Sequence, residues 1–470
     1  MKQVKKQVKM KISITVLPCF RVSLGAIVAA ILILFALQNT NAEELSANAG
    51  DGNFGLEYQA GIIWGSDNVW LPGSSLWVQY EQDLGERSMV DFERGRACVQ
   101  ILIRAEDNPG RKQVLDHLQQ GIGNLILRKP ADPVEMIKKR SAGIEQTIVT
   151  ASGAIKVPDE KEIRIYLVKQ GDSLWKISRK FGMKTGDLAR LNNLDKTETL
   201  YNGQPMKVFV FTSHDLTPDS KPSDRARDPI LLDQIRMVDG CLVHPSMVRD
   251  FAIQIIEKKP PEKNIITGAD GIERLVVSVE FELVSNHLEI RARKFYPMVL
   301  KNAEKYMVDP AVVMGIIHTE SMFNPLARSS TPAYGLMQVV PDGGGNEAYS
   351  TIHDKENNLT PQYLYDPENN IELGTAYYNI LKKRYMKNIN DPLSRAYCAV
   401  AAYNAGASNV GYAFIAKKSI SMAYREINRM KPADVYQKLI TKLPYKESRD
   451  YVRRVFKRAE LYREWNKNAL

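Results

Sequence analysis

The sequence predicts a multidomain α+β protein. At 470 residues the chain is too long for one ordinary hydrophobic core, and its length suits roughly three domains. Its content of 44% hydrophobic and 25% charged residues is that of a globular protein. Strand-like and helix-like patterns both occur: strands are predicted at 75–80, 97–103 and 275–283, and helices at 108–127, 248–256 and 309–321.

Residues 1–42 have the pattern of an export signal. A basic start precedes an apolar run at 22–37, and the small residues Thr40 and Ala42 follow it. The run is slightly long for a signal-peptide core and short for a membrane span. A cleaved signal peptide and a membrane anchor retained through residues 12–37 therefore both fit. Either one predicts an exported protein of the periplasm or cell envelope.

The positive charge of the chain does not indicate nucleic-acid binding. The whole chain carries 64 basic and 54 acidic residues, a net charge of +10. Six of the basic residues and none of the acidic ones lie in residues 1–42, which leaves 58 basic against 54 acidic residues in the remainder. A net charge of +4 over that length is too small to predict a polyanion-binding protein.

The four cysteines give no sign of a metal or redox site. Cys19 lies in the export segment, and Cys98, Cys241 and Cys398 are widely dispersed. Their spacing matches neither a zinc site nor a redox pair, so we expect buried free thiols. No metal or cofactor is implied.

Glu320 is the strongest candidate for a catalytic group. It ends a helical run in which Asp309 is suited to the N-cap and Pro310 to the first helical position. Counting in fours from Val312 leads through Ile316 to Glu320, so the carboxyl group shares a stripe with apolar residues. Such a carboxyl group, close to the negative end of a helix dipole, favours its protonated form. A general acid that protonates a glycosidic oxygen needs this property.

Three motifs follow one another in the C-terminal part of the chain. They are Glu320-Ser-Met-Phe-Asn-Pro325, Ala333-Tyr-Gly-Leu-Met-Gln338 and Ala402-Tyr-Asn404. In this order they resemble the soluble-lytic-transglycosylase branch of the goose-type lysozyme superfamily. The resemblance implies an α-helical, lysozyme-like catalytic domain, which we place at residues 288–470.

This resemblance also suggests which residues contact the substrate, which would be peptidoglycan glycan strands. Glu320 matches the catalytic acid of the family. The remaining matches are predicted to bind the substrate: Ser329, Thr331, Met337, Gln338, Tyr403, Asn404 and Tyr451. Thr331 departs from the family, which often has serine there, and simple core packing is an alternative role for Met337.

The family reaction needs only one protein carboxylate. Glu320 would protonate the oxygen between N-acetylmuramic acid and N-acetylglucosamine and would then deprotonate the muramoyl C6 hydroxyl, which gives a 1,6-anhydro product. Other carboxylates (Asp342, Glu347, Asp354 and Asp366) lie at 341–366, which we expect to be irregular and solvated. Two alternatives stay open: a muramidase that uses water, and a peptidoglycan-binding scaffold with a vestigial catalytic domain.

A second motif set occupies residues 162–210. Its anchors are Tyr166, Val168, Gly171, Asp172, Leu174, Ile177, Leu188, Asn192, Leu194, Gly203, Gln204 and Met206. They resemble a LysM module, which implies a small βααβ fold that binds N-acetylglucosamine-containing polymers. By the same resemblance we expect Gly171, Asp172 and Ser173 to contact the glycan. A spacer or protein-interaction role is the alternative.

The remaining segments are predicted to form one discontinuous α+β domain. Residues 89–102 and 284–288 both resemble the N-terminal domain of the membrane-bound lytic transglycosylase C family, where the two pieces are not separated by an insertion. We therefore predict that residues 55–160 and 228–287 form this domain. The LysM module would be inserted between its two halves, with a polar linker at 211–227.

Overall fold

The computed structural model describes most of residues 53–467. The gaps within that range are 82–83, 105–106, 108, 131–160, 182, 184, 196–197, 212–226 and 356–358. The export segment predicted at 1–42 and most of the predicted linker at 211–227 lie outside the described residues. None of the helices in the described part is long and apolar enough to cross a membrane.

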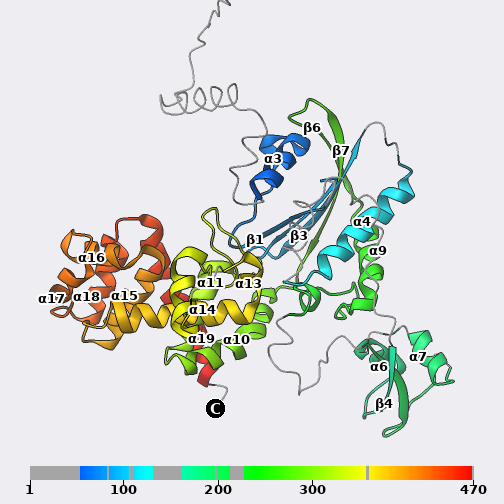
Figure 1. Ribbon diagram of the computed structural model, residues 1–470. Helices are drawn as coiled ribbons and strands as arrows, with labels where there is room; N and C mark the ends of the chain where they lie inside the picture. The colour runs from blue at the N-terminus through cyan, green and yellow to red at the C-terminus, as the bar shows by residue number, and fades with distance from the viewer. Residues whose placement is uncertain are drawn as a thin grey trace, which may run out of the picture. The chain divides into compact units, whose positions relative to one another are not determined.

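A five-stranded antiparallel sheet contains segments from both sides of the LysM region of the sequence (Figure 1). Its strand order is β1-β2-β3-β7-β6. The strands are β1 (Leu76–Tyr80), β2 (Glu86–Asp91), β3 (Arg96–Arg104), β6 (Glu262–Thr267) and β7 (Glu273–Glu282). In the central pair, Val99 of β3 lies opposite Val279 of β7, and both side chains are buried.

Two helices, α4 (Arg111–Ile126) and α9 (Val248–Lys258), contact each other and the central strands β3 and β7. Their apolar positions recur at helical spacing, as in Leu118, Ile122 and Leu125 of α4, and these side chains are buried. The helix predicted at 108–127 therefore exists but begins only at Arg111. Gly110 has an extended backbone, and its N–H donates to Oε1 of Gln113 at 2.9 Å.

Apart from short 3-10 helices, one α-helix and two strands before residue 270 were not predicted. They are α3 (Asn53–Trp64), β2 and β6. Strand β6 lies at the edge of the sheet and most of its side chains are exposed, so it lacks the alternating apolar pattern that marks a half-buried strand. Cys98 and Cys398 are buried free thiols as predicted, whereas Cys241 is only half-buried.

The LysM region forms the predicted βααβ unit. It consists of β4 (Lys161–Leu167), α6 (Leu174–Lys180), α7 (Thr185–Leu191) and β5 (Pro205–Phe211). The two strands pair antiparallel and form a sheet of their own. A small separate core fills the unit, with buried side chains from Val168, Leu174, Ile177, Met183, Leu188, Ala189, Met206 and Val208.

The C-terminal part is built mainly from helices, with a non-helical stretch at 322–340. Its elements are α10 (His287–Lys305), α11 (Pro310–Ser321), η4 (Pro341–Gly345), α12 (Asn346–His353), α13 (Pro361–Tyr365), α14 (Pro367–Ile380), η5 (Leu381–Tyr385), α15 (Pro392–Ala405), α16 (Ala407–Ile415), α17 (Ile420–Ile427), α18 (Pro432–Lys442) and α19 (Lys446–Lys467). Helix α11 contacts both α10 and α19. The expectation of an irregular segment at 341–366 was wrong, because η4, α12 and α13 occupy most of it.

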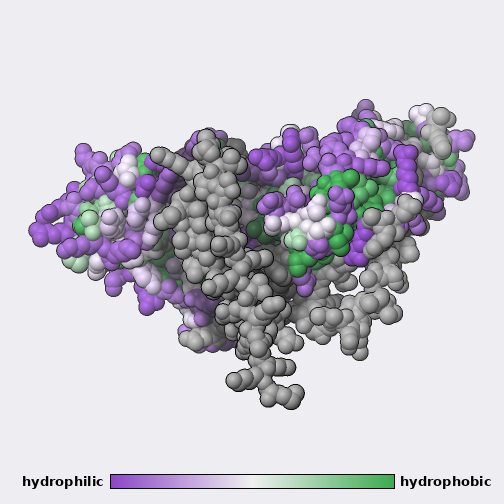
Figure 2. All heavy atoms as spheres, turned by 90° about the horizontal axis from the view of Figure 1, so that it is seen from above, coloured by the Kyte–Doolittle hydropathy of each residue, from purple (hydrophilic) through white to green (hydrophobic). Residues whose placement is uncertain are grey.

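The outer surface is mainly polar. The face shown in Figure 2 is mostly hydrophilic, with apolar side chains gathered in one area. Among the described residues, exposed apolar side chains include Ile265 in β6 and Ile272 between β6 and β7. Single exposed apolar residues are common on globular proteins and carry no functional argument by themselves.

Candidate active site

Helix α11 places Glu320 one residue before its C-terminal end. The helix begins as predicted: Oδ1 of Asp309 accepts a hydrogen bond from the N–H of Ala311 at 2.8 Å, and Pro310 occupies the first turn. It ends at Ser321, because Met322 adopts a left-handed backbone conformation with φ of 52°. Glu320 therefore lies near the negative end of the helix dipole.

The burial of α11 goes beyond the single stripe expected from the sequence. Every residue from Ala311 to His318 is buried, so the helix is enclosed on all sides. Helix α19 lies close to Gly315, where a Cβ atom would be 2.5 Å from the carbonyl oxygen of Val455. Thr319 and Glu320 differ from the buried residues before them in being only half-buried. The Glu320 carboxyl group thus sits at the boundary between a dry interior and solvent.

The surroundings of Glu320 favour its neutral form. Burial raises the pKa of Glu320 to about 7, and the negative charge of Glu447 acts in the same direction. Two groups oppose this shift and lower the pKa: the hydroxyl of Tyr451, which donates to Oε1 of Glu320 at 2.7 Å, and the positive charge of Arg454. Protonated and ionised forms are therefore both accessible near neutral pH.

Two tyrosines complete the surroundings of the acid. Tyr451 comes from α19 and is buried, and Tyr403 comes from α15 and is half-buried. The Tyr403 hydroxyl donates to the carbonyl oxygen of Met337 at 2.9 Å. Burial, followed by the nearby charge of Glu320, raises the pKa of both phenols well above 10. Both tyrosines are therefore neutral hydrogen-bond donors at physiological pH.

The loop at 333–338 is held in place by its own backbone and by α14. Nε2 of Gln338 donates to the carbonyl oxygens of Ala327 and Gly335, at 3.0 and 3.1 Å. Met337 has a fully buried side chain, 0% exposed, and its N–H donates to Oδ1 of Asn370 at 2.8 Å. The Met337 side chain therefore occupies the core position that was the alternative to substrate contact.

The other predicted substrate-binding residues lie near the surface. Ser329 is half-buried, and its hydroxyl donates to the backbone carbonyl oxygen of Thr331. Thr331 and Asn404 are exposed. Contact of these residues with the substrate stays a prediction from the family resemblance.

Asn370 supports the loop at 333–338 but was not identified from the sequence. Its side chain is fully buried, and its Nδ2 donates to the carbonyl oxygens of Tyr334 and Leu364 at 2.8 and 2.7 Å. The available signal was its position on α14, three and four residues before the buried Leu373 and Gly374. A polar residue on such an apolar face needs hydrogen-bond partners and often has a structural role.

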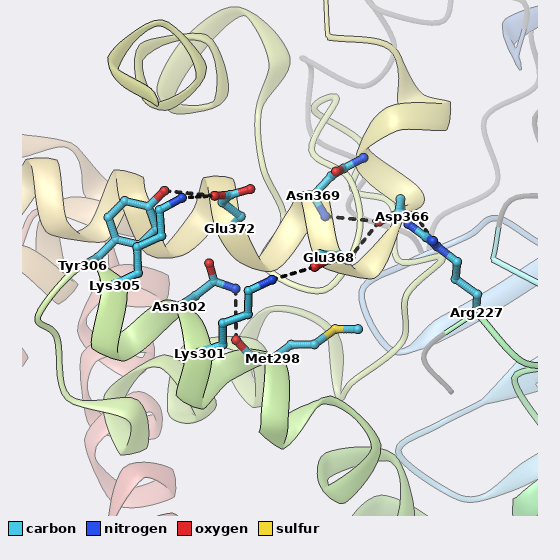
Figure 3. Close-up of polar contacts among 10 residues, drawn as sticks. All are labelled: Arg227, Met298, Lys301, Asn302, Lys305, Tyr306, Asp366, Glu368, Asn369 and Glu372. Atoms are coloured by element: carbon cyan, nitrogen blue, oxygen red, sulfur yellow. Dashed lines mark hydrogen bonds and ion pairs between the residues drawn. The ribbon is translucent and has the colours of Figure 1, made fainter. Parts of the chain in front are cut away.

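Charged contacts fix α14 against α10 (Figure 3). Lys301 pairs with Glu368 at 2.9 Å, and one turn later Lys305 pairs with Glu372 at 2.5 Å. The N-terminus of α14 is capped by Asp366, whose Oδ1 accepts from the N–H groups of Glu368 and Asn369. These contacts hold the helix that presents Asn370 to the loop.

Two of the four carboxylates at 341–366 have structural roles and are not simply solvated loop charges. Asp366 pairs with Arg227 at 2.8 Å in addition to capping α14. Glu347 accepts hydrogen bonds from Tyr385 and Arg384 at 3.2 Å each. Asp342 and Asp354 are exposed, as expected.

Glu447 is a further carboxylate that sequence reasoning did not weigh. It lies in the first turn of α19, four residues before Tyr451, and it is exposed. Its charge raises the pKa of Glu320, so the two groups interact electrostatically. Helical spacing from Tyr451 was the signal that could have identified it.

The LysM residues predicted to contact glycan lie in one exposed loop. Gly171 has a φ of 85°, a backbone conformation that favours glycine. Oδ2 of Asp172 accepts from the Tyr166 hydroxyl at 2.7 Å and from the N–H of Lys169 at 2.8 Å. Oγ of Ser173 accepts from the N–H of Lys176 and caps α6. These bonds fix the shape of the loop, while glycan contact stays a prediction.

Comparisons with known proteins match both motif sets. The transglycosylase SLT domain family model matches residues 297–423, and the LysM domain model matches residues 166–209. Membrane-bound lytic murein transglycosylase C of Pectobacterium atrosepticum is 36% identical over 250 residues, which cover 53% of this chain and 68% of the relative. The protein of the same name from Haemophilus influenzae is 34% identical over 278 residues, covering 59% and 74%.

A solved structure of an inactive mutant of the lytic transglycosylase Slt from Pseudomonas aeruginosa is also similar. It shares 27% identity with a TM-score of 0.28, over 36% of this chain and 24% of that one. The chain belongs to the membrane-bound lytic murein transglycosylase C family and is a peptidoglycan lytic transglycosylase, a carbon–oxygen lyase that acts on a polysaccharide.

Proposed function

We propose that the protein cleaves the β-1,4 bond between N-acetylmuramic acid and N-acetylglucosamine and leaves 1,6-anhydro-N-acetylmuramic acid ends. The observation that carries this proposal is the state of Glu320. Its pKa of about 7 suits a group that first donates a proton and then accepts one.

The reaction is balanced and consumes no water. Glu320 donates its proton to the bridging oxygen, and the bond from that oxygen to C1 of the muramoyl sugar breaks. The substrate's 2-acetamido oxygen stabilises C1, which replaces a protein nucleophile. The ionised Glu320, stabilised by its hydrogen bond from Tyr451, then takes the proton of the C6 hydroxyl. The C6 oxygen bonds to C1, and the acid returns to its starting form.

The substrate would contact the residues that match the family: Ser329, Thr331, Met337, Gln338, Tyr403, Asn404 and Tyr451. For Met337, whose side chain is buried, core packing is the alternative role. The neutral phenols near Glu320 support a site that stabilises a positively charged sugar intermediate without a second ion.

The hydrolytic alternative would need a second carboxylate, for which Glu447 is a candidate. A muramidase needs a base that activates water, and Glu447 is a carboxylate whose charge acts on Glu320. If water attacked C1, the products would be heavier by one water than anhydro products. Mass spectrometry of digested peptidoglycan separates the two reactions. Anhydro-muropeptides support the proposal, hydrolysed muropeptides favour the muramidase, and an absence of products favours a binding scaffold.

We further propose that the enzyme acts in the cell envelope during wall remodelling or turnover. Residues 1–42 would direct export, either as a cleaved signal or as an anchor through residues 12–37. The relatives' description as membrane-bound supports an anchor. The division into a discontinuous α+β domain, an inserted LysM module and the catalytic domain at 288–470 is part of this proposal. Fractionation of cells, with and without residues 1–42, tests the location.

A further inference from the structure

Arg291 is a buried cation at a junction of three chain segments. It lies in α10 and is 1% exposed. Its Nη2 donates to the carbonyl oxygen of Phe92 at 3.0 Å, its Nη1 to Oε1 of Gln234 at 2.5 Å, and its Nε to the carbonyl oxygen of Met322 at 3.2 Å. The guanidinium group also lies over the Phe92 ring, 4.5 Å from its centroid.

Two of these partners come from the α+β part of the chain. Phe92 directly follows β2, in the turn toward β3, and Gln234 ends the short helix η2 (Leu232–Gln234). Both residues are fully buried. The turn is itself joined to the exit of β7, because the N–H of Leu283 donates to the carbonyl oxygen of Gly95 at 2.8 Å. Arg291 therefore binds a rigid corner of the five-stranded sheet.

The third partner is the end of the helix that carries Glu320. Met322 and Phe323 have φ values of 52° and 59°, in the left-handed region that non-glycine residues rarely adopt. Such a conformation persists where surrounding contacts enforce it. Arg291 holds the Met322 carbonyl, and Arg458 donates to the carbonyl oxygen of His318 at 2.9 Å. Glu320 lies between these two fixed points.

No described residue forms an ion pair with Arg291. Among the described residues its hydrogen-bond partners are neutral acceptors, including Nδ1 of His287 at 2.9 Å. Burial and the charge of Arg291 lower the pKa of His287 to about 4, so this ring is neutral and can accept. Burial also lowers the pKa of Arg291 to about 9, with Asp233 and Tyr462 opposing the shift.

A buried charge of this kind adds little to the stability of the fold, because apolar residues of similar size at the same place often give equal stability. Arginine, however, offers a planar fork that can reach several acceptors at once in fixed directions. The hydrogen bonds of Arg291 therefore fix the positions of the segments that they join. One of those segments carries the catalytic acid.

We propose that Arg291 is a positioning residue through which the α+β domain fixes the end of α11 and thereby the carboxyl group of Glu320. The inference rests on the proposed role of Glu320 as general acid and base. It gives the α+β domain a part in catalysis beyond that of a passive scaffold. Arg291 itself does not touch the reacting atoms.

The test compares Arg291→Lys with Arg274→Lys in the full chain. Arg274 is a buried arginine of β7 that pairs with Asp270 in the turn before that strand. We expect both variants to unfold at a lower temperature. Only Arg291→Lys should lower kcat on soluble glycan chains, by about tenfold, which is less than the ~10²-fold that a misplacement of about 1 Å can cost.

A pH profile separates positioning from simple destabilisation. If the end of α11 loosens, water reaches Glu320 and its pKa falls toward 4.5, so the alkaline limb of kcat/KM moves to lower pH. The groups that act on Glu320 or respond to its charge, Tyr403, Glu447, Tyr451 and Arg454, are unchanged in both variants. Unchanged kcat and an unchanged profile in folded Arg291→Lys would overturn the proposal.

Gln234→Met provides the test if Arg291→Lys does not fold. It removes one acceptor of the fork and leaves Arg291 in place, so we expect about a threefold loss of kcat with the same shift of the alkaline limb. Wild-type kinetics in Gln234→Met would reject the proposal. Rates are measured as the number of glycosidic bonds broken, so the variants can be compared whether the products are anhydro or hydrolysed. An active Glu320→Gln enzyme would instead refute the proposed function.

Discussion

The catalytic cluster and the LysM loop are built over different distances along the chain. In the cluster, Tyr451 bonds to Glu320 across 131 positions and Tyr403 bonds to Met337 across 66. In the LysM loop, Asp172 bonds to Tyr166 and Lys169, six and three positions away. The cluster depends on the packing of distant helices, whereas the loop is shaped by its neighbours.

The two regions also differ in exposure. Glu320 sits at the edge of an enclosed helix, where burial changes its pKa. Gly171 and Ser173 are exposed, and the nearby loop at 200–202 carries Tyr201, which is 68% exposed. Proton transfer needs a group in a defined, partly dry setting, whereas binding a polymer needs accessible surface. We therefore expect changes in the cluster to affect chemistry and changes in the LysM module to affect binding.

The largest expected effect is that of Glu320→Gln. The amide preserves shape but neither donates nor accepts the required proton, so activity should fall by about 10³–10⁴-fold or more. Turnover on soluble glycan chains measures this loss. Glu372→Gln is a matched control, because Glu372 pairs with Lys305 on α10 and has no role in the reaction. A tenth of wild-type turnover in Glu320→Gln would contradict the assignment.

Tyr451→Phe should have the next largest effect. It removes a hydrogen bond to a carboxylate, typically worth about 1.5–3 kcal/mol. Because that bond lowers the pKa of Glu320, its loss raises the pKa and moves the alkaline limb of kcat/KM to higher pH. Tyr403→Phe is the comparison: it frees the Met337 carbonyl and should cost about 1–3 kcal/mol.

Tyr403→Phe should lower activity without a comparable shift of the pH limb, since its hydroxyl bonds to a carbonyl oxygen and not to Glu320. A pH profile of each variant, recorded beside thermal unfolding, measures the difference. Identical profiles for wild type and Tyr451→Phe would show that the bond to Glu320 is absent in solution. Unchanged kinetics and stability in Tyr403→Phe would limit that residue to packing.

Removing residues 162–210 should affect insoluble substrate selectively. A LysM module raises the local concentration of glycan near the active site, so binding to whole sacculi should weaken by about tenfold or more. The rate on short soluble chains should barely change. Pull-down on sacculi and turnover on soluble chains measure the two effects. Equal losses on both substrates would make the module a structural part of the catalytic domain.

A point substitution sharpens that experiment. Tyr201→Ala should reproduce part of the loss on sacculi, because an exposed aromatic ring offers a surface to sugar rings. Ile165→Ala is the control, since Ile165 is 61% exposed but lies on β4, outside the loops at 171–173 and 200–202. Equal binding by the two variants would remove Tyr201 from the glycan-binding surface.

A separate expected effect concerns stability and not turnover. The pKa of Glu320 is raised from 4.5 to about 7 in the folded protein, so folding favours the protonated form. Its contribution is fully present below pH 4.5 and is lost as the pH rises through 7. Glu320→Gln should therefore gain thermal stability relative to wild type over this interval. A difference in unfolding temperature that stays constant from pH 4 to pH 8 would contradict the shift.

Short-range features of this protein were determined by the sequence itself. The cap of α11 by Asp309, the βααβ order of the LysM module and the turn at Gly171 all follow from residues close to one another. The family motifs around Glu320 were also readable, because each occupies a few consecutive positions. These features depend on local backbone preferences, which a short sequence expresses directly.

Only the tertiary structure decided how the site works. The enclosure of α11, the commitment of the Tyr403 hydroxyl to Met337 and the support of the loop by Asn370 all join segments far apart in the chain. Edge strand β6 was missed for a related reason, since its exposed side chains leave no alternating pattern. The pKa of Glu320 depends on which distant groups exclude water from it and which donate to it. Local sequence patterns do not specify that arrangement, because it arises from packing among whole elements.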